Sequence, residues 1–257
     1  MQLQRSLPGL KQRGLGLAAI SYDPPATLKA FADQHGITFP LLSDAGSVVI
    51  RRYGLLNAQA DGRAAGIPHP GTFILDTRGR VVSRSFEAAY QERASAASLV
   101  AGRAPGAAGT RIDTRHVTIA TSSSDDLIAP GTRFSLFVDV APKAKMHVYS
   151  PDQKAYIPVA LTLTTDATIR PQAPVFPPSE PYLFKPLNEQ QRVYSKPFRI
   201  VQDVTMPVTA ATRERARTGG TLTIAGTLHY QACDDLVCYR PMDVPLTWTV
   251  TLQPLAR

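Results

Sequence analysis

Hydrophobic and polar positions follow two different patterns along the chain, and the change comes near residue 100. In the first half, short apolar runs alternate with segments in which apolar residues recur every three or four positions. Strand-like and helix-like segments in alternation are typical of an α/β layer fold. The strand-like runs are 15–23, 39–44, 72–76 and 80–86, and the helix-like segments are 1–14, 24–36 and 91–103.

Local signals set the limits of these segments. Two prolines open the helix predicted over 24–36, and Gly36 ends it. After the next strand-like run, Ser43 or Asp44 can cap a further short helix that carries Val48. The last two strand-like runs of this half are separated by a short turn and predict a hairpin.

The second half has the pattern of strands alone. Apolar and polar residues alternate in short stretches separated by Pro, Gly and Asp turns, which predicts an antiparallel β-sandwich. These stretches are 116–121, 133–140, 147–150, 159–165, 198–204, 222–232 and 245–252. A small-residue segment with Gly and Pro precedes them. The sequence therefore predicts a domain over 1–100, a linker over 101–112 and an all-β domain over 113–257.

Composition and charge exclude several classes. The apolar fraction of 44% is enough for folded cores, and no apolar run approaches the roughly 20 residues that span a bilayer. The first residues lack the apolar core of a signal peptide. The net charge of +8 is spread along the chain, with no basic run longer than the pair Arg51 and Arg52. Such diffuse charge does not favour specific nucleic-acid binding.

The first half resembles the thioredoxin-like redoxins of the AhpC/TSA, or peroxiredoxin, type. The stretches that carry the resemblance are AAISYDPPATLKAFADQHGITFPLLSD and HPGTFILDTRGRVV. The resemblance implies a thioredoxin-like domain, in which the proline at the position of Pro70 is usually cis. A cis proline is a specific feature of a fold, because trans is the default.

The first half departs from that family in its chemistry. The family places its reactive cysteine after a first core strand, and here no cysteine precedes Cys233. Residues 1–14 already look like the helix that follows that strand, although Pro8 lies inside it. Without the strand, two strand edges lack partners. We therefore expect this domain to be N-terminally truncated. An in-frame stop codon directly before Met1, with no cysteine codon upstream, would contradict that expectation.

Both cysteines of the chain lie in the stretch YQACDDLVCYRP, as Cys233 and Cys238. They follow one strand and lead into another, and opposed residues of an antiparallel pair lie close enough for a disulfide. A disulfide here would close a short ring, which the chain-entropy model values at roughly 2 kcal/mol. Three interpretations remain open: a structural disulfide, a metal site completed by His229 with Asp234 or Asp235, and a redox pair. The short ring and the lack of a second ligand pair favour the redox pair.

The second half resembles the N-terminal periplasmic domain of the thiol:disulfide interchange protein DsbD. Besides the cysteine stretch, KAKMHVYSP and NEQQRVYSKPFRIVQDVTMPV carry the resemblance. It implies an immunoglobulin-like sandwich in the periplasm, with Cys233 and Cys238 as the catalytic pair. The partners implied are thioredoxin-like redox proteins or a membrane thiol reductase, and no cofactor is implied. The resemblance also implies a mobile cap over 176–188, with Tyr182 and Phe184 as its aromatic residues.

The charges beside the pair predict slow thiols. Asp234 and Asp235 disfavour a thiolate by repulsion, and Arg240 is the nearest cation in sequence. The predicted function is thiol–disulfide exchange through Cys233 and Cys238, with the chain's own redoxin domain as one potential acceptor. Equal redoxin reduction with and without the tether, at equal domain concentrations, would contradict that last point. The alternatives are a non-catalytic interaction module with a structural disulfide and, for a longer natural chain, a peroxiredoxin-like antioxidant enzyme.

Overall fold

A computed structural model describes residues 2–62, 65–86, 92–99, 107–154, 156–184 and 187–253. The chain forms two compact units, Met1–Leu99 and Val100–Arg257, each with its own core. No helix among the described residues is long and apolar enough to cross a membrane.

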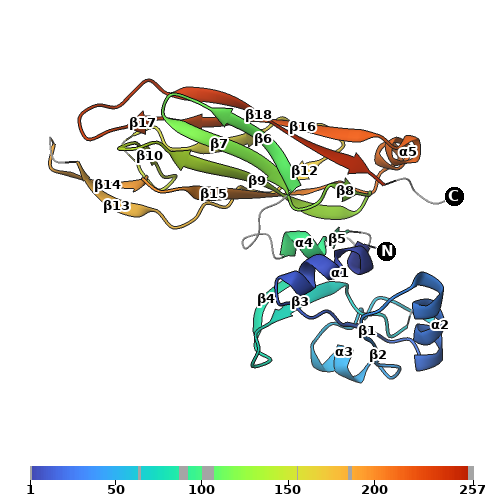
Figure 1. Cartoon of the computed structure of the whole chain (residues 1–257). Coiled ribbons are helices and arrows are strands. Elements are labelled where there is room, and N and C mark those ends of the chain that lie inside the picture. Colours follow the sequence, from blue (N-terminus) through green and yellow to red (C-terminus); the bar gives the residue numbers. More distant parts are fainter. Residues whose placement is uncertain are drawn as a thin grey trace. The chain divides into compact units, whose positions relative to one another are not determined.

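The first unit contains short helices and strands in alternation, as the sequence predicts (Figure 1). The elements are α1 Gln2–Gln12, β1 Ala19–Ser21, α2 Pro25–His35, β2 Leu41–Ser43, α3 Val48–Arg52, β3 Gly71–Leu75, β4 Val81–Phe86, β5 Arg93–Ala94 and α4 Ala96–Leu99. The prediction of a helix over 91–103 is wrong at its start, because residues 93–94 form β5 and the helix α4 begins only at Ala96. Residues 91 and 100–103 lie outside the described residues.

The helix limits follow from local chemistry. Helix α1 accommodates Pro8 and buries Leu7 and Leu10 on one face. Helix α2 ends at Gly36, whose φ of 61° lies in the left-handed region that glycine adopts without strain. The Asp44 carboxylate accepts hydrogen bonds from the backbone N–H groups of Val48 and Ile50, so Asp44 closes the first turn of α3.

The strands of the first unit form two separate pairs. Strand β1 runs parallel to β2, and β3 forms an antiparallel hairpin with β4. Large apolar side chains on these strands remain exposed: Ile20, Leu42, Leu75, Val81, Val82 and Phe86. The two pairs do not combine into one sheet within the described residues. The expectation that this domain is N-terminally truncated stays a prediction.

The prediction of a cis peptide bond before Pro70 is wrong. The described residues contain no cis peptide bond. The His69 N–H donates to the carbonyl of Leu55 at 2.6 Å, and the chain then runs directly into β3. Trans is the more stable isomer of a bond to proline by about 0.5–1 kcal/mol, so this bond keeps its default geometry.

The second unit is made almost entirely of strands. They are β6 Ala107–Asp113, β7 Val117–Ser123, β8 Leu127–Ile128, β9 Thr132–Pro142, β10 His147–Tyr149, β11 Ala160–Leu163, β12 Arg170–Pro171, β13 Glu180–Phe184, β14 Glu189–Tyr194, β15 Phe198–Thr205, β16 Thr221–Tyr230, β17 Ala232–Cys233 and β18 Met242–Leu252. Helix α5, Ala210–Thr218, connects β15 to β16.

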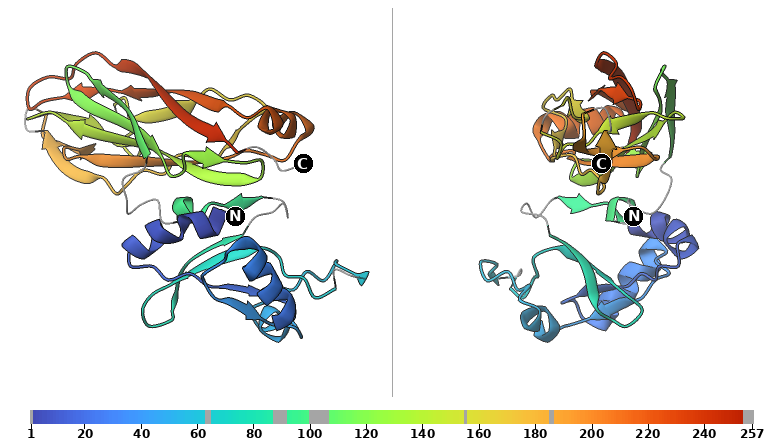
Figure 2. Two further views of the ribbon diagram at one scale, coloured as in Figure 1. Left: turned by 45° about the vertical axis from the view of Figure 1, so that its right-hand side comes forward. Right: turned by 90° about the vertical axis from the view of Figure 1, so that its left-hand side faces the viewer.

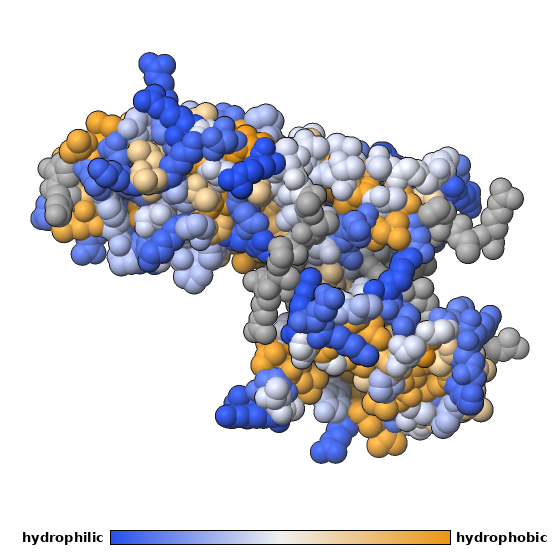
Figure 3. Space-filling model, in the orientation of Figure 1, coloured by the Kyte–Doolittle hydropathy of each residue, from blue (hydrophilic) through white to orange (hydrophobic). Residues whose placement is uncertain are grey.

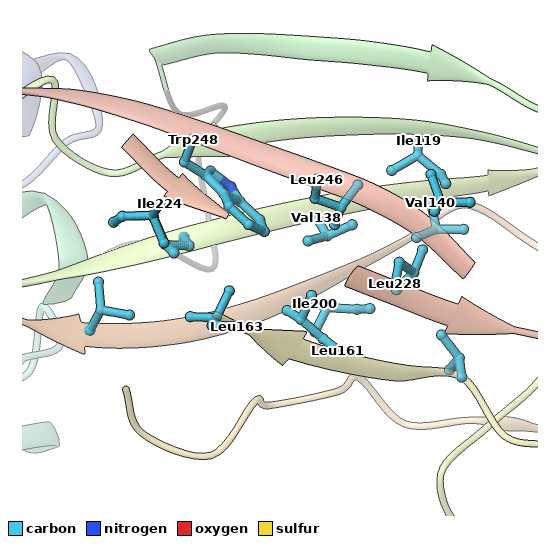
Figure 4. Close-up of a cluster of buried hydrophobic side chains, with 14 of the residues drawn as sticks. Ile119, Val138, Val140, Leu161, Leu163, Ile200, Ile224, Leu228, Leu246 and Trp248 are labelled. Atoms are coloured by element: carbon cyan, nitrogen blue, oxygen red, sulfur yellow. The ribbon is translucent and has the colours of Figure 1, made fainter. Parts of the chain in front are cut away.

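Two sheets pack face to face around the main core of this unit, and the end-on view in Figure 2 shows the layers. One sheet has the order β12-β15-β9-β7-β6 and the other the order β11-β16-β18-β8. Their alternating apolar side chains point toward one another, including Val138 and Ile200 from the first sheet and Leu228 and Trp248 from the second (Figure 4). The predicted β-sandwich arrangement is present, and the period-2 pattern supplies its core.

The predicted linker over 101–112 is wrong in its second part. Residues 107–113 form β6, which pairs antiparallel with β7. Gly109 permits this pairing, because a Cβ atom there would lie 1.5 Å from the carbonyl oxygen of Thr121. The small residues of this segment therefore allow the backbones of β6 and β7 to approach each other closely, whereas the sequence pattern suggested a linker. Residues 101–106 lie outside the described residues.

A third sheet, of order β13-β14-β10-β17, lies at one end of the second unit, at the left in Figure 1. The predicted cap segment 176–188 contributes the edge strand β13 to this sheet and pairs with β14. Pro181 is tolerated because β13 is an edge strand. Residues 180–184 of this segment therefore form a paired strand where the sequence predicted a loop. The two cysteines belong to this end of the unit.

Candidate functional site

The two cysteines form a disulfide across a tight turn. Cys233, in β17, lies opposite Cys238 in an antiparallel bridge, with Cα atoms 4.1 Å apart. The Cys233 residue is only 1% exposed, whereas Cys238 is exposed. One sulfur-bearing residue is thus presented to solvent and the other is held inside the unit.

The residues considered for a metal site make other contacts in this structure. Both sulfurs are bonded to each other, and Nδ1 of His229 lies 2.6 Å from Oδ1 of Asp243. His229 sits in β16, where Asp243 of β18 is its direct cross-strand neighbour. Within the described part of the chain, no group of three or more His, Cys, Asp or Glu residues could hold a metal ion.

Asp234 builds the turn between the cysteines. Its Oδ1 accepts the backbone N–H groups of Leu236 and Val237, each at 2.8 Å, and its Oδ2 accepts the hydroxyl of Tyr239 at 2.7 Å. These bonds, that of Tyr239 first, lower the pKa of Asp234 to about 2. The carboxylate that was expected mainly to repel a thiolate also fixes the loop that presents Cys238.

We expect this turn to loosen in acid. The pKa of Asp234 is about 2 in the folded protein, below the ordinary 3.8. A depressed carboxyl pKa contributes stability that is present above the ordinary value and is lost as the pH falls through the folded value. The amide proton shifts of Leu236 and Val237 should therefore titrate with a midpoint near pH 2. An Asp234→Asn variant should show no such titration, and a midpoint near pH 4 in the unsubstituted protein would contradict the assignment.

Tyr149 contacts both sulfurs of the disulfide. Its hydroxyl oxygen lies 3.2 Å from Sγ of Cys238 and 3.4 Å from Sγ of Cys233. Disulfide sulfurs carry no proton, so the hydroxyl is the donor. Burial raises the pKa of Tyr149 to about 12, and the hydroxyl keeps its proton near neutral pH. The Tyr156 ring stacks on Tyr149 at 4.5 Å, and its hydroxyl donates to Glu189.

Of the two aromatic residues predicted for the cap, Tyr182 lies at the site. Its hydroxyl donates to Oδ1 of Asp235 at 2.7 Å, and it packs against the buried cluster that includes Cys233. Burial and then Asp235 raise the pKa of Tyr182 to about 12. Phe184 lies at the other end of β13, opposite Glu189. The structure thus brings Tyr182 to the cysteine turn and places Phe184 two residues further along the strand.

Sequence reasoning assigned no role to two residues of β10 that border the disulfide. His147 is the direct cross-strand partner of Cys233, and Tyr149 bonds to both sulfurs. The signal was present in the stretch HVY, because residues two apart in a strand face the same side. What the sequence did not contain was the pairing of β10 with β17, which joins segments about 85 residues apart.

Exposed apolar side chains lie in the turn directly before the presented cysteine. Leu236 and Val237, in the turn itself, are 78% and 50% exposed, and Leu183 of β13 is also exposed. Figure 3 shows apolar side chains at this end of the second unit. Apolar residues at the tip of a turn have no role in a core, so they are available for contact with another molecule.

Residues 1–84 match the sequence model of the AhpC/TSA family, which confirms the resemblance of the first half and its thioredoxin-like class. Alkyl hydroperoxide reductase E of Mycobacterium tuberculosis (strain ATCC 25618 / H37Rv) is 42% identical over 80 residues, which are 30% of this chain and 49% of that protein. The chain spans about half the length of the curated relatives it matches.

Two solved structures are distantly similar. The N-terminal periplasmic domain of ScsB from Proteus mirabilis matches with 12% identity and a TM-score of 0.40, covering 58% of this chain and 53% of that one. The N-terminal domain of DsbD from Neisseria meningitidis, in the reduced form, matches with 16% identity and a TM-score of 0.31, covering 46% and 82%. At these scores the similarity supports no residue-by-residue comparison.

Proposed function

We propose that the chain is a thiol–disulfide exchange protein that works through Cys233 and Cys238. The observation that carries this proposal is the asymmetry of the disulfide, in which an exposed Cys238 is bonded to a buried Cys233. The ring is short and joins residues that strand pairing already holds together, so it adds little as a structural cross-link. A disulfide with one accessible sulfur is open to attack by a thiolate.

The proposed exchange begins at Cys238. A thiolate of a partner dithiol attacks Sγ of Cys238, the bond between the two cysteine sulfurs breaks, and its electron pair passes to Sγ of Cys233. The Tyr149 hydroxyl, already 3.4 Å from that sulfur, donates a hydrogen bond to the new thiolate. The partner's second thiol then displaces Cys238, which leaves the partner oxidised and the cysteine pair reduced by two electrons. In the reduced protein, Cys238 releases its proton to water, and the thiolate attacks the disulfide of an acceptor in turn.

The proposed partners are thioredoxin-like redox proteins or a membrane thiol reductase, in the periplasm. The exposed Leu236 and Val237 beside Cys238 support a protein partner, because an apolar rim would exclude water around the reacting sulfurs. The first unit is thioredoxin-like, as such partners are. We therefore propose the redoxin domain itself as one acceptor, in a longer chain whose redoxin domain carries a cysteine. We further propose that the second unit, with β6 as part of it, is an immunoglobulin-like sandwich and that residues 1–100 form a separate domain.

The reduction potential tests the exchange function against a structural disulfide. Labile exchange disulfides have potentials above about −300 mV, whereas structural disulfides of secreted proteins lie below it. We expect the Cys233–Cys238 pair to lie above that value. The measurement equilibrates the protein with dithiothreitol or glutathione buffers and counts free thiols by alkylation and mass spectrometry. A Cys233→Ser/Cys238→Ser variant gives the background, and a potential below about −300 mV would contradict the function.

A further inference from the structure

His147 is placed directly against the buried cysteine. It is the cross-strand partner of Cys233 in the antiparallel pair of β10 and β17. Side chains of such a pair lie on the same face of the sheet, with Cβ atoms about 4.5–5.5 Å apart. Burial separates both residues from water, since His147 is 2% exposed and Cys233 is 1% exposed.

The imidazole of His147 is buried among aromatic rings, and one of its ring nitrogens makes no hydrogen bond to the described residues. The Tyr182 ring is 4.4 Å away and tilted, and the Tyr149 ring is 5.9 Å away with its edge toward the imidazole. Nε2 of His147 has no hydrogen-bond partner among the described residues. A buried polar atom without a partner costs about 1–3 kcal/mol. This nitrogen is therefore available to a partner that the site gains in another state.

The charges that face His147 set its state while the disulfide is closed. Burial lowers the pKa of His147, and the carboxylates of Asp235 and Asp234, in the cysteine turn, oppose that shift. The other titratable groups that face it are Tyr149 in β10 and Tyr182 in β13, and both keep their protons. The two sulfurs of the disulfide are neutral. With the disulfide closed, the imidazole is therefore neutral near pH 7.

We propose that His147 takes up a proton when the Cys233–Cys238 disulfide opens, so that the reduced protein holds a Cys233 thiolate beside a His147 imidazolium. This proposal rests on the proposed exchange function and deepens it. The partner dithiol loses two electrons and two protons and becomes a disulfide. The cysteine pair gains the two electrons, and the two protons reside on Cys238 and on His147.

Opening the disulfide creates a negative charge beside His147. A thiolate at Cys233 is a new anion next to the imidazole, and an opposite charge at that distance favours the protonated ring. Asp234 and Asp235 add to the same attraction. The ion pair also lowers the pKa of the Cys233 thiol, which makes Cys233 a better leaving group when the partner attacks Cys238. His147 therefore couples proton uptake to the rate of exchange.

Nuclear magnetic resonance of the ¹³C- and ¹⁵N-labelled imidazole measures this coupling. The protein is titrated with the disulfide closed and again in excess dithiothreitol. We expect the midpoint of His147 to rise by at least about one pH unit on reduction, a tenfold gain in proton affinity. His116 provides an internal control, because it is buried too and neither of its ring nitrogens has a hydrogen-bond partner in the part of the chain that the structure describes. Its ring stacks on Tyr239, whereas His147 is paired with Cys233. Its midpoint should move far less.

Two variants separate titration from packing. In His147→Phe the ring stays without its nitrogens, and in His147→Gln a hydrogen bond remains possible but no proton is taken up near neutral pH. We expect both variants to be opened by dithiothreitol about tenfold more slowly than the unsubstituted protein at pH 7. A His147→Gln rate equal to the unsubstituted rate, or a His147 midpoint unmoved by reduction, would overturn this proposal alone. A disulfide that dithiothreitol does not open would contradict the exchange function, and this proposal with it.

Discussion

A reduced Cys238→Ser variant, which keeps only the buried cysteine, is expected to react with a disulfide reagent about 100-fold more slowly than a reduced Cys233→Ser variant. Cys238 is exposed at the end of the turn and needs no rearrangement to meet the reagent. Cys233 is 1% exposed, so the reagent reaches it only after local opening. An opening free energy of about 3 kcal/mol, within the range of local unfolding, gives this ratio. The rate of 5,5′-dithiobis(2-nitrobenzoate) reduction measures it directly.

The same two variants in urea give the matched control. Once unfolded, both cysteines are exposed, and the two rates should converge to within a few fold because the intrinsic reactivity of the thiols is similar. Equal rates in the folded proteins would mean that burial does not select the attacking cysteine. A faster reaction of Cys238→Ser would assign the attack to Cys233 and would contradict the proposed mechanism.

The sequence predicted the strands of the second unit where the period-2 pattern was strong. The predicted stretches 133–140 and 198–204 became β9 and β15, because their alternate side chains form the core between the two sheets. Among the strands that it missed are β13 and β6. The first follows a Pro-rich run and the second consists largely of small residues, so neither carries an apolar alternation that a pattern could reveal.

The local sequence pattern predicted only those residues of the candidate site that are neighbours along the chain. Cys233, Cys238 and the acids between them lie in one short stretch, and that stretch alone allowed the disulfide interpretation. Tyr149 and His147 come from β10, and only the pairing of β10 with β17 brings them to the sulfurs. Register between distant strands depends on the whole sheet, which is why a local pattern could not supply these two residues.

Position within a strand also decided which aromatic residue reaches the site. The resemblance named Tyr182 and Phe184 together as the aromatic residues of the cap, with nothing to distinguish them. In the structure Tyr182 lies opposite Gln191, near the middle of the pairing with β14, while Phe184 ends the strand. The Tyr182 hydroxyl donates to Asp235 in the cysteine turn, whereas Phe184 has no donor group and lies further along the strand. A difference of two residues, about 7 Å along a strand, separates a site residue from a neighbouring one.

Replacement of Trp248 by Ala is expected to lower the free energy of unfolding of the second unit by about 3–5 kcal/mol, more than reduction of the disulfide does. Trp248 is buried between the two sheets, and its indole N–H donates to the carbonyl of Phe137 at 3.1 Å. Its removal leaves a cavity in the core and takes away this hydrogen bond. Reduction of Cys233–Cys238 removes a short ring at one end of the unit, worth about 2 kcal/mol by chain entropy.

Urea unfolding followed by circular dichroism compares the two changes, with Trp248→Phe as the matched variant. Trp248→Phe keeps an aromatic ring in the core and loses the N–H donor, so we expect a loss of only about 1–2 kcal/mol. The reduced protein should remain folded, because the core between the two sheets does not involve the cysteines. A redox-active pair must open in each cycle without unfolding its own scaffold. If reduction cost more stability than Trp248→Ala, the disulfide would be a structural cross-link, and the exchange function would lose its physical basis.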